Sequence, residues 1–351
     1  MKFIDSLLEL ITYDIGIDLG TANTMVYLRG KGIVVSEPSV VAIDKKTNRV
    51  LAVGKEARQM IGRTPANVVA VRPLRDGVIT DFDTTQAMLH HFIEQAHAYV
   101  NKSFKIPRPR VIVGVPSSVT EVERQAVIDA CKTAGAREVF IVEEAMAAAI
   151  GAGLPVEQAS GSMIVDIGGG TSDIAVLSLG DIVVDKTIRI AGDEMDQDII
   201  DYVRDKYNML IGERTAEDVK IAIGSAAPLD EEQVVVIQGR DLISGLPKSV
   251  EFSSVEVREA ILTSIAQITD AIKDAIEETP PELLTDLLTS GIKLAGGGAL
   301  IRGIDKLWQE ELNLPVHIVN DPMSAVARGT ALMLDHIQLL EKIQRSWNEI
   351  I

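Results

Sequence analysis

The sequence contains the same strand–turn–strand pattern twice, and this duplication restricts the possible folds more than any other feature. Residues 17–28 read IDLGTANTMVYL and residues 165–177 read VDIGGGTSDIAVL, so an apolar strand, an aspartate, a Gly/Thr turn and a second strand occur in both. A glycine turn and a β-branched strand follow each copy, which is typical of hairpins with polar tips. Asp18 and Asp166 are 148 residues apart, so a whole α/β domain fits between them. We therefore expect two similar domains.

Strands alternate with helical stretches after each hairpin, as in α/β folds. The sequence Thr120-Glu121-Val122-Glu123 is a capping box and predicts a helix over 120–134. Further strands are expected at 110–115, 139–142, 234–237 and 292–295, and further helices from Glu143, from Asp193, from Thr215 and over 254–278.

Composition limits the partners of such a chain. Its 351 residues include 34 basic and 51 acidic side chains, a net charge of -17, which disfavours nucleic acid as a partner. The single cysteine, Cys131, excludes an intramolecular disulfide and is expected to be a small core residue. The longest stretch without a charged residue, 145–156, has 12 residues, against about 20 for a membrane-spanning helix.

The two hairpin tips carry residue types that bind a polyphosphate. Glycine lets backbone N–H groups approach phosphate oxygens, and Thr or Ser hydroxyls add donors, so an anion site forms without a lysine. Two matched copies favour this interpretation over an ordinary hairpin turn. Asp18 and Asp166 would lie near the phosphates, so we expect Mg²⁺ between them, bound through water. The candidate phosphate-binding residues are Gly20, Thr21, Ala22, Asn23, Gly168, Gly169, Gly170 and Thr171.

A third glycine cluster is Gly296-Gly297-Gly298, which follows the strand at 292–295. We expect a helix directly after it, which would place backbone N–H groups at a helix N-terminus. A plain turn is the alternative. The sequence has neither a P-loop motif nor a dinucleotide-binding fingerprint.

Together these motifs resemble those of the actin-like ATPase superfamily and, within it, the MreB/Mbl family of bacterial actin homologues. The resemblance is carried by residues 16–24, 67–77, 143–151, 166–171 and 296–298. It implies an α/β, actin-like ATPase fold, with duplicated ribonuclease-H-like domains and inserted subdomains around a nucleotide cleft. The expected parts are an amphipathic segment at 1–11, a first domain at 12–150 with an insert at about 36–70, a second domain at 151–330 with an insert at about 191–257, and C-terminal helices at 331–351 that return to the first domain.

The resemblance also implies a function, a cytoskeletal ATPase that binds ATP and Mg²⁺ and forms paired protofilaments. Such a protein is cytoplasmic, lies on the inner face of the cell membrane and organises wall synthesis with RodZ, MreC and MreD to maintain rod shape. Glu144 matches the residue that orients the attacking water, and Thr171 matches the hydroxyl that senses the γ-phosphate. The neighbouring Glu143 is expected to cap the helix. The adenosine side would be bound by Ala216, Glu217, Val219, Lys220, Gly296, Gly297, Gly298 and Ala299.

The same superfamily offers two alternative functions, of which only the first stays open at this point. A small-molecule kinase would share the phosphate-binding hairpins, but nothing in the sequence marks its substrate site. A chaperone ATPase would continue into a peptide-binding domain, for which the sequence offers no room after the last expected helices.

Two segments are candidates for membrane contact. On a helix over 1–11, Phe3, Ile4, Leu7, Leu8 and Ile11 fall on one side, which suits either a membrane interface or packing against the protein. Phe104 and Ile106 lie among basic residues in a proline-containing loop, which is either a membrane-inserting or a solvated loop. Residues 1–150 have a net charge of +1 and residues 151–351 one of -18. We therefore expect the first domain to face an anionic membrane.

Overall fold

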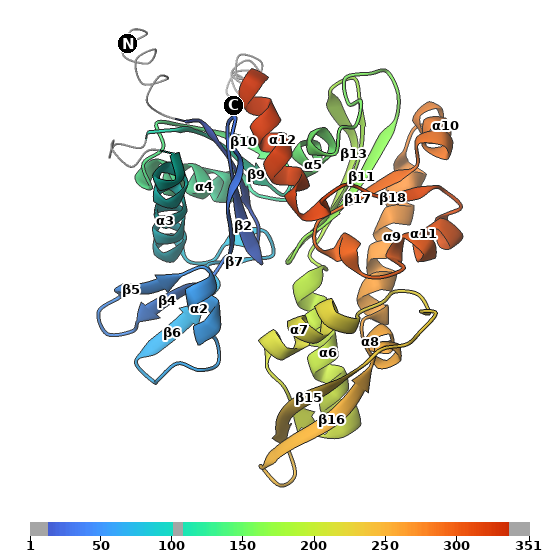
Figure 1. Cartoon of the computed structure of the whole chain (residues 1–351). Helices are drawn as coiled ribbons and strands as arrows, with labels where there is room; N and C mark the ends of the chain where they lie inside the picture. The colour runs from blue at the N-terminus through green and yellow to red at the C-terminus, as the bar shows by residue number, and fades with distance from the viewer. Residues whose placement is uncertain (1–12, 101–107, 337–351) are drawn as a thin grey trace. The chain divides into compact units, whose positions relative to one another are not determined.

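The computed structural model describes residues 13–100 and 108–336, which form two units (Figure 1). The first unit comprises the chain up to Leu154 and from Ser324 onwards, and the second comprises Pro155–Met323. The expected end of the second domain at residue 330 is wrong. Helix α12 (Ala325–Met333) belongs to the first unit, because it packs against α5 (Glu144–Gly151).

The first unit contains a five-stranded sheet that holds the first copy of the duplicated pattern. Its central strand β1 pairs antiparallel with β2 and parallel with β9. The buried side chains of β1 and β9 are almost all apolar, which is typical of strands covered on both faces. The strand order is β10 (Glu138–Glu143), β9 (Arg110–Val115), β1 (Ile15–Leu19), β2 (Asn23–Leu28), β3 (Gly32–Pro38).

The second unit repeats this sheet strand for strand. Its central strand β11 pairs antiparallel with β12 and parallel with β17. In the direction used for the first sheet, the order is β18 (Val316–Ile318), β17 (Ile292–Ala295), β11 (Ser162–Ile167), β12 (Ser172–Ser178), β13 (Asp181–Ile188). The turns also agree in length, because the last paired residues are Leu19 with Thr24 in one hairpin and Ile167 with Ser172 in the other. The predicted duplication is confirmed.

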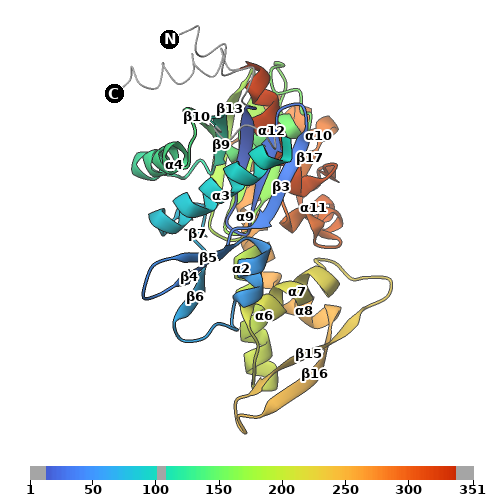
Figure 2. The ribbon, with the colours of Figure 1, turned by 60° about the vertical axis from the view of Figure 1, so that its left-hand side comes forward.

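Helices α3 (Phe82–Val100) and α4 (Glu121–Thr133) lie beside the first sheet (Figure 2). The predicted capping box is present, since the Glu123 N–H donates to Thr120 Oγ1 at 3.3 Å and the Thr120 N–H donates to the Glu123 carboxylate at 2.8 Å. Cys131 is fully buried in the core, as predicted. A smaller part of the unit comprises the three-stranded sheet of β4 (Val41–Asp44), β5 (Val50–Val53) and β6 (Val68–Val71) with helix α2 (Lys55–Met60). The short strands β7 (Leu74–Arg75) and β8 (Val78–Ile79) pair with each other and pack on the main core.

The second unit has helices next to its sheet and a further group around a β-hairpin (Figure 1). The hairpin group comprises α6 (Gly192–Tyr207), β14 (Met209–Leu210), α7 (Glu213–Ile223), β15 (Val234–Asp241), β16 (Pro247–Ser253) and α8 (Ser254–Ala260). The helices next to the sheet are α9 (Leu262–Glu278), α10 (Pro281–Ser290) and α11 (Ile304–Leu312). The single helix expected over 254–278 is wrong, because the backbone at Ile261 (φ -84°, ψ 3°) separates α8 from α9.

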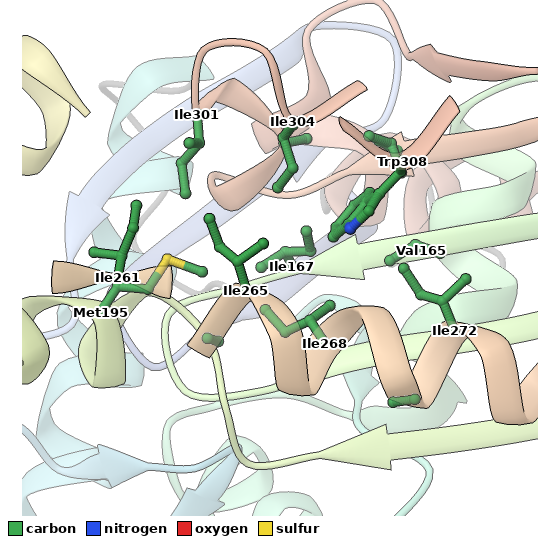
Figure 3. Packing of buried hydrophobic residues seen from close by; sticks show 14 of the residues in the cluster. Val165, Ile167, Met195, Ile261, Ile265, Ile268, Ile272, Ile301, Ile304 and Trp308 are labelled. Atoms are coloured by element: carbon green, nitrogen blue, oxygen red, sulfur yellow. The ribbon is translucent and has the colours of Figure 1, made fainter. Parts of the chain in front are cut away.

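The core of the second unit forms where α9 and α11 meet the sheet (Figure 3). Ile265, Ile268 and Ile272 lie along one side of α9, at the spacing of one helix face. Trp308 of α11 is fully buried among them, and its Nε1–H donates to Thr269 Oγ1 at 2.8 Å. The buried indole N–H is therefore satisfied.

The candidate membrane segments lie outside the described residues. This applies to Phe3, Ile4, Leu7, Leu8, Ile11, Phe104 and Ile106. Within residues 13–100 and 108–336, no helix combines the length and apolarity needed to cross a membrane.

Candidate functional site

In the first unit, Asp18 and Glu144 come to the same end of the sheet. Asp18 of β1 is in register with Gly114 of β9, and Gly114 is in register with Val142 of β10. Glu144 begins α5 two residues after Val142. A Cβ atom on Gly114 would lie 3.3 Å from Glu144 Cγ, so the glycine leaves room for this side chain. Two residues 126 positions apart in the sequence thus flank one strand end.

The electrostatics of Asp18 suit a cation. Burial raises the pKa of its carboxyl group to about 7, because the charged form loses hydration. A divalent cation beside it would favour the charged form again. The described part of the chain has no group of three or more His, Cys, Asp or Glu side chains that could hold a metal. Mg²⁺ suits a site with few protein ligands, because it keeps several of its bound water molecules.

The β1–β2 turn is held by residues outside the hairpin. A Cβ atom on Gly20 would lie 2.6 Å from the Asn23 carbonyl oxygen, so the turn requires glycine there. Ser39 Oγ donates to the Gly20 carbonyl at 2.6 Å, and the Gly77 N–H donates to Thr21 Oγ1 at 3.1 Å. Thr21 Oγ1 still carries a proton that it can donate to a ligand.

Glu143 does not have the expected capping role. It is the last residue of β10 and the N-cap of α5, with φ -72° and ψ 134°, but its side chain makes no capping hydrogen bond. Short side chains such as Ser, Thr, Asp and Asn are the ones that reach back to the first-turn N–H groups, and glutamate is not among them.

In the second unit, the phosphate loop candidate is closed by its own backbone and tied to α6. The Gly168 N–H donates to the Thr171 carbonyl at 2.9 Å. The Gly168 carbonyl accepts from the Gly192 N–H at 3.2 Å, and the Gly169 carbonyl accepts from the Asp193 N–H at 2.7 Å. The first turn of α6 therefore fixes two carbonyl groups of the loop.

The third glycine cluster packs on the end of β11. Gly296 has φ 78°, and a Cβ atom on it would lie 2.2 Å from the Ile167 carbonyl oxygen and 2.4 Å from Asp166 Oδ1. A Cβ atom on Gly298 would lie 2.3 Å from Ile167 Cγ2. The structure therefore brings Asp166 and the 296–298 turn together.

The α-helix expected directly after this cluster is wrong. A short 3₁₀ turn, η1 (Gly298–Leu300), follows the strand, and α11 begins only at Ile304. The N–H groups of Leu300 and Ile301 are used within this turn, donating to the carbonyls of Gly297 and Gly298. The alternative, a turn rather than a helix N-terminus, describes this segment.

The residues assigned to the adenosine side differ in exposure. Ala216, Val219 and Ala299 are buried in the hydrophobic core of the second unit, so their side chains pack there rather than against a ligand. Glu217 and Lys220 are only partly buried. Lys220 Nζ lies 2.8 Å from Asp196 Oδ1 of α6.

Several residues of these sites are absent from the sequence-based prediction. Gly114 could have been found, because a glycine inside a strand often marks the close approach of another group. Ser39 and Asp196 carry no such signal, since each contacts its partner through the fold and not through a motif.

Known proteins are similar to this chain along nearly its whole length. A family model described as MreB/Mbl protein matches residues 12–342. The cell shape-determining protein Mbl of Bacillus subtilis (strain 168) is 50% identical over 329 residues, which are 94% of this chain and 98% of that protein. The cell shape-determining protein MreB of Escherichia coli (strain K12) is 50% identical over 330 residues, 93% of this chain and 94% of that protein.

Solved structures are similar as well. MreB5 of Spiroplasma citri has been crystallised bound to ADP and bound to AMPPNP, and both structures match this one with a TM-score of 0.88. They are 43% and 42% identical to this chain, covering 95% of it and 98% and 99% of those chains. The predicted fold class is confirmed by these matches. The chain belongs to the MreB/Mbl family of actin-like proteins.

Proposed function

We propose that the chain binds ATP with Mg²⁺ and hydrolyses it. The observation that carries this proposal is the placement of Asp18 and Glu144 at one strand end, next to a glycine-containing turn whose length recurs after Asp166. The nucleotides in the two Spiroplasma citri MreB5 structures, ADP and AMPPNP, support it.

The two turns bind the phosphates through backbone N–H groups and hydroxyl groups. Asp18 and Asp166 would hold Mg²⁺ through water, and the bound ion would neutralise phosphate charge. Glu217, Lys220 and the backbone of Gly296–Ala299 bind the adenosine side, while Ala216 and Val219 anchor α7 in the core. The phosphate-binding residues are Gly20, Thr21, Ala22, Asn23, Gly168, Gly169 and Gly170.

Glu144 positions the attacking water and accepts its proton. The water oxygen attacks the γ-phosphorus, the bond to the β,γ-bridging oxygen breaks, and ADP leaves with the charge on that oxygen. The Thr171 hydroxyl donates to the γ-phosphate, so it distinguishes the states before and after cleavage. Being in the first turn of α5, Glu144 is held at the strand end by packing beside Gly114.

The test compares two adjacent glutamates. Glu144→Gln removes the base with almost no change in shape, and we expect phosphate release to fall about 100-fold while the ATP dissociation constant stays the same. Glu143→Gln is the matched control and should keep the wild-type rate. Single-turnover phosphate release and calorimetric titration measure the two quantities. Equal rates for both variants would refute the role of Glu144.

We also propose that the protein forms filaments. The dependence of filament formation on nucleotide tests this proposal. The cell-shape names of the Bacillus and Escherichia relatives support a role in determining cell shape. We propose that the protein maintains rod shape by organising wall synthesis, with RodZ, MreC and MreD as partners. Sedimentation with ATP and Mg²⁺ should pellet the protein, whereas apo protein should stay in the supernatant. A monomer under all nucleotide and lipid conditions would contradict the proposal.

Membrane binding on the inner face of the cell membrane is the second half of this proposal. Deletion of residues 1–11 should reduce co-sedimentation with anionic liposomes, because it removes the apolar side chains Phe3, Ile4, Leu7, Leu8 and Ile11. The comparison variant carries Phe104→Ser and Ile106→Ser. Loss of binding only in this second variant would assign membrane contact to the loop.

A further inference from the structure

An ion pair between α6 and α7 is connected, through the first turn of α6, to the Gly168–Gly170 phosphate loop of the second unit. Lys220 Nζ is 2.8 Å from Asp196 Oδ1, and it also donates to the Gly192 carbonyl. The two side chains are only 13% and 8% exposed. Lys220 thus contacts both the acid in the second turn of α6 and the first residue of that helix.

Gly192 connects this pair to the loop. Its N–H donates to the Gly168 carbonyl at 3.2 Å, and the next N–H, of Asp193, donates to the Gly169 carbonyl at 2.7 Å. A Cβ atom on Gly192 would lie 3.3 Å from both the Gly168 carbonyl oxygen and Lys220 Nζ. One residue therefore contacts the loop on one side and the lysine on the other.

We propose that Asp196 is a positioning residue, which through Lys220 and Gly192 holds the Gly168–Gly170 loop in register with α7. Phosphate binding and adenosine binding within this unit are then coupled, because Lys220 belongs to both networks. The inference rests on the proposed ATP binding and assigns to that site a residue that does not touch the nucleotide.

Stability of the fold is a poor explanation for this pair. Desolvation makes buried ion pairs roughly neutral compared with apolar residues of the same size. Burial raises the pKa of Asp196 to about 7, although Lys220 acts in the opposite direction, and the charges of Glu217 and Asp193 raise it further. Such a costly carboxylate is better explained by its connection to the loop.

The first experiment measures ATP and ADP binding to the full chain by calorimetric titration. Asp196→Asn keeps the shape of the side chain and removes its charge, and we expect both dissociation constants to rise about tenfold, the change that 1.4 kcal/mol produces. The matched control is Glu232→Gln, which breaks the Arg258–Glu232 ion pair (2.7 Å) of the same unit, whose arginine bonds to Ser225 and Ala227 and not to the loop. This control should bind both nucleotides as the wild type does.

A second variant separates positioning from folding. Gly192→Ala adds a methyl group between the Gly168 carbonyl and Lys220, yet alanine favours helix formation, so nucleotide affinity should fall while the urea midpoint does not. Asp196→Asn combined with Gly192→Ala should lose less affinity than the sum of the two effects, because both act on one contact. Wild-type affinity in Gly192→Ala and Asp196→Asn would overturn the inference. Absence of ATP binding in the wild type would instead overturn the proposed function.

Discussion

At the scale of single residues, Gly297 and Gly298 show that two adjacent glycines can differ completely in the room they leave for a side chain. A Cβ atom on Gly298 would lie 2.3 Å from Ile167 Cγ2, whereas one on Gly297 would have no neighbour within 4 Å. Gly297 has φ -68°, which any residue adopts. Both are part of one glycine run in the sequence, so only the fold distinguishes them.

Gly298→Ala should therefore lower the free energy of unfolding by about 1–3 kcal/mol, the usual cost of inserting a methyl group into a packed site. Gly297→Ala is the control and should change it by less than about 0.5 kcal/mol. Urea unfolding followed by circular dichroism measures both. A cost at Gly297 equal to that at Gly298 would contradict the packing described for Ile167.

Cys131 gives a second prediction. Burial raises the pKa of its thiol to about 12, so at pH 8 the group is protonated and shielded from solvent. The native chain should react with iodoacetamide far more slowly than the chain in urea, where the pKa returns to its usual range. Mass spectrometry of the alkylated protein follows the reaction. Equal rates in both states would show that the thiol is accessible in the fold.

The positions of Asp18 and Asp166 on matching central strands could be predicted because the duplication marks both strands, and that of Glu144 at the start of a helix because an apolar strand precedes an alanine-rich stretch there. Asp196 could not, since its partner Lys220 lies 24 positions away on another helix. The buried position of Ala216 could not be predicted either. The resemblance assigns this residue to the ligand-binding helix, but it does not say whether the side chain faces the ligand or the core.

At the scale of elements, α5 and α12 pack with their backbones in contact. A Cβ atom on Gly329 would lie 1.7 Å from the Ala147 carbonyl oxygen, and one on Gly151 would lie 1.9 Å from the Ala325 carbonyl oxygen. The alanine-rich sequence of α5 predicts a helix but not this partner, which follows it by more than 170 residues. The sequence also gives no sign of the break at Ile261, because no glycine or proline lies there.

Gly329→Ala should lower the free energy of unfolding by about 3 kcal/mol, since the helices must separate to admit a methyl group. Gly212→Ala is the control, because its Cβ atom would have no neighbour within 4 Å and its φ is -93°. Since Gly212 is the N-cap of α7, alanine there should cost about 1 kcal/mol at most. Chemical unfolding of the two variants provides the comparison. Equal stability would mean that α12 can shift along α5 without loss.

At the scale of the whole molecule, each unit has its own hydrophobic core. Gly329 belongs to the first unit and Gly298 to the second. In calorimetric unfolding without nucleotide we therefore expect two transitions, with Gly329→Ala lowering the temperature of one and Gly298→Ala that of the other. A single transition shifted equally by both variants would show that the units unfold together.

The chain order of the two units has a consequence for synthesis. The second unit is a continuous segment, Pro155–Met323, whereas the first is completed only by α12. Gly16 of β1 and Gly114 of β9 contact this helix, since their Cβ atoms would lie 2.3 Å from Thr330 Oγ1 and 2.8 Å from Val326 Cγ1. A ribosome therefore releases the entire second unit before the first can close. Until then the nascent chain exposes the face of β1 and β9 that α12 covers, and transiently exposed apolar surface of this kind is prone to aggregation.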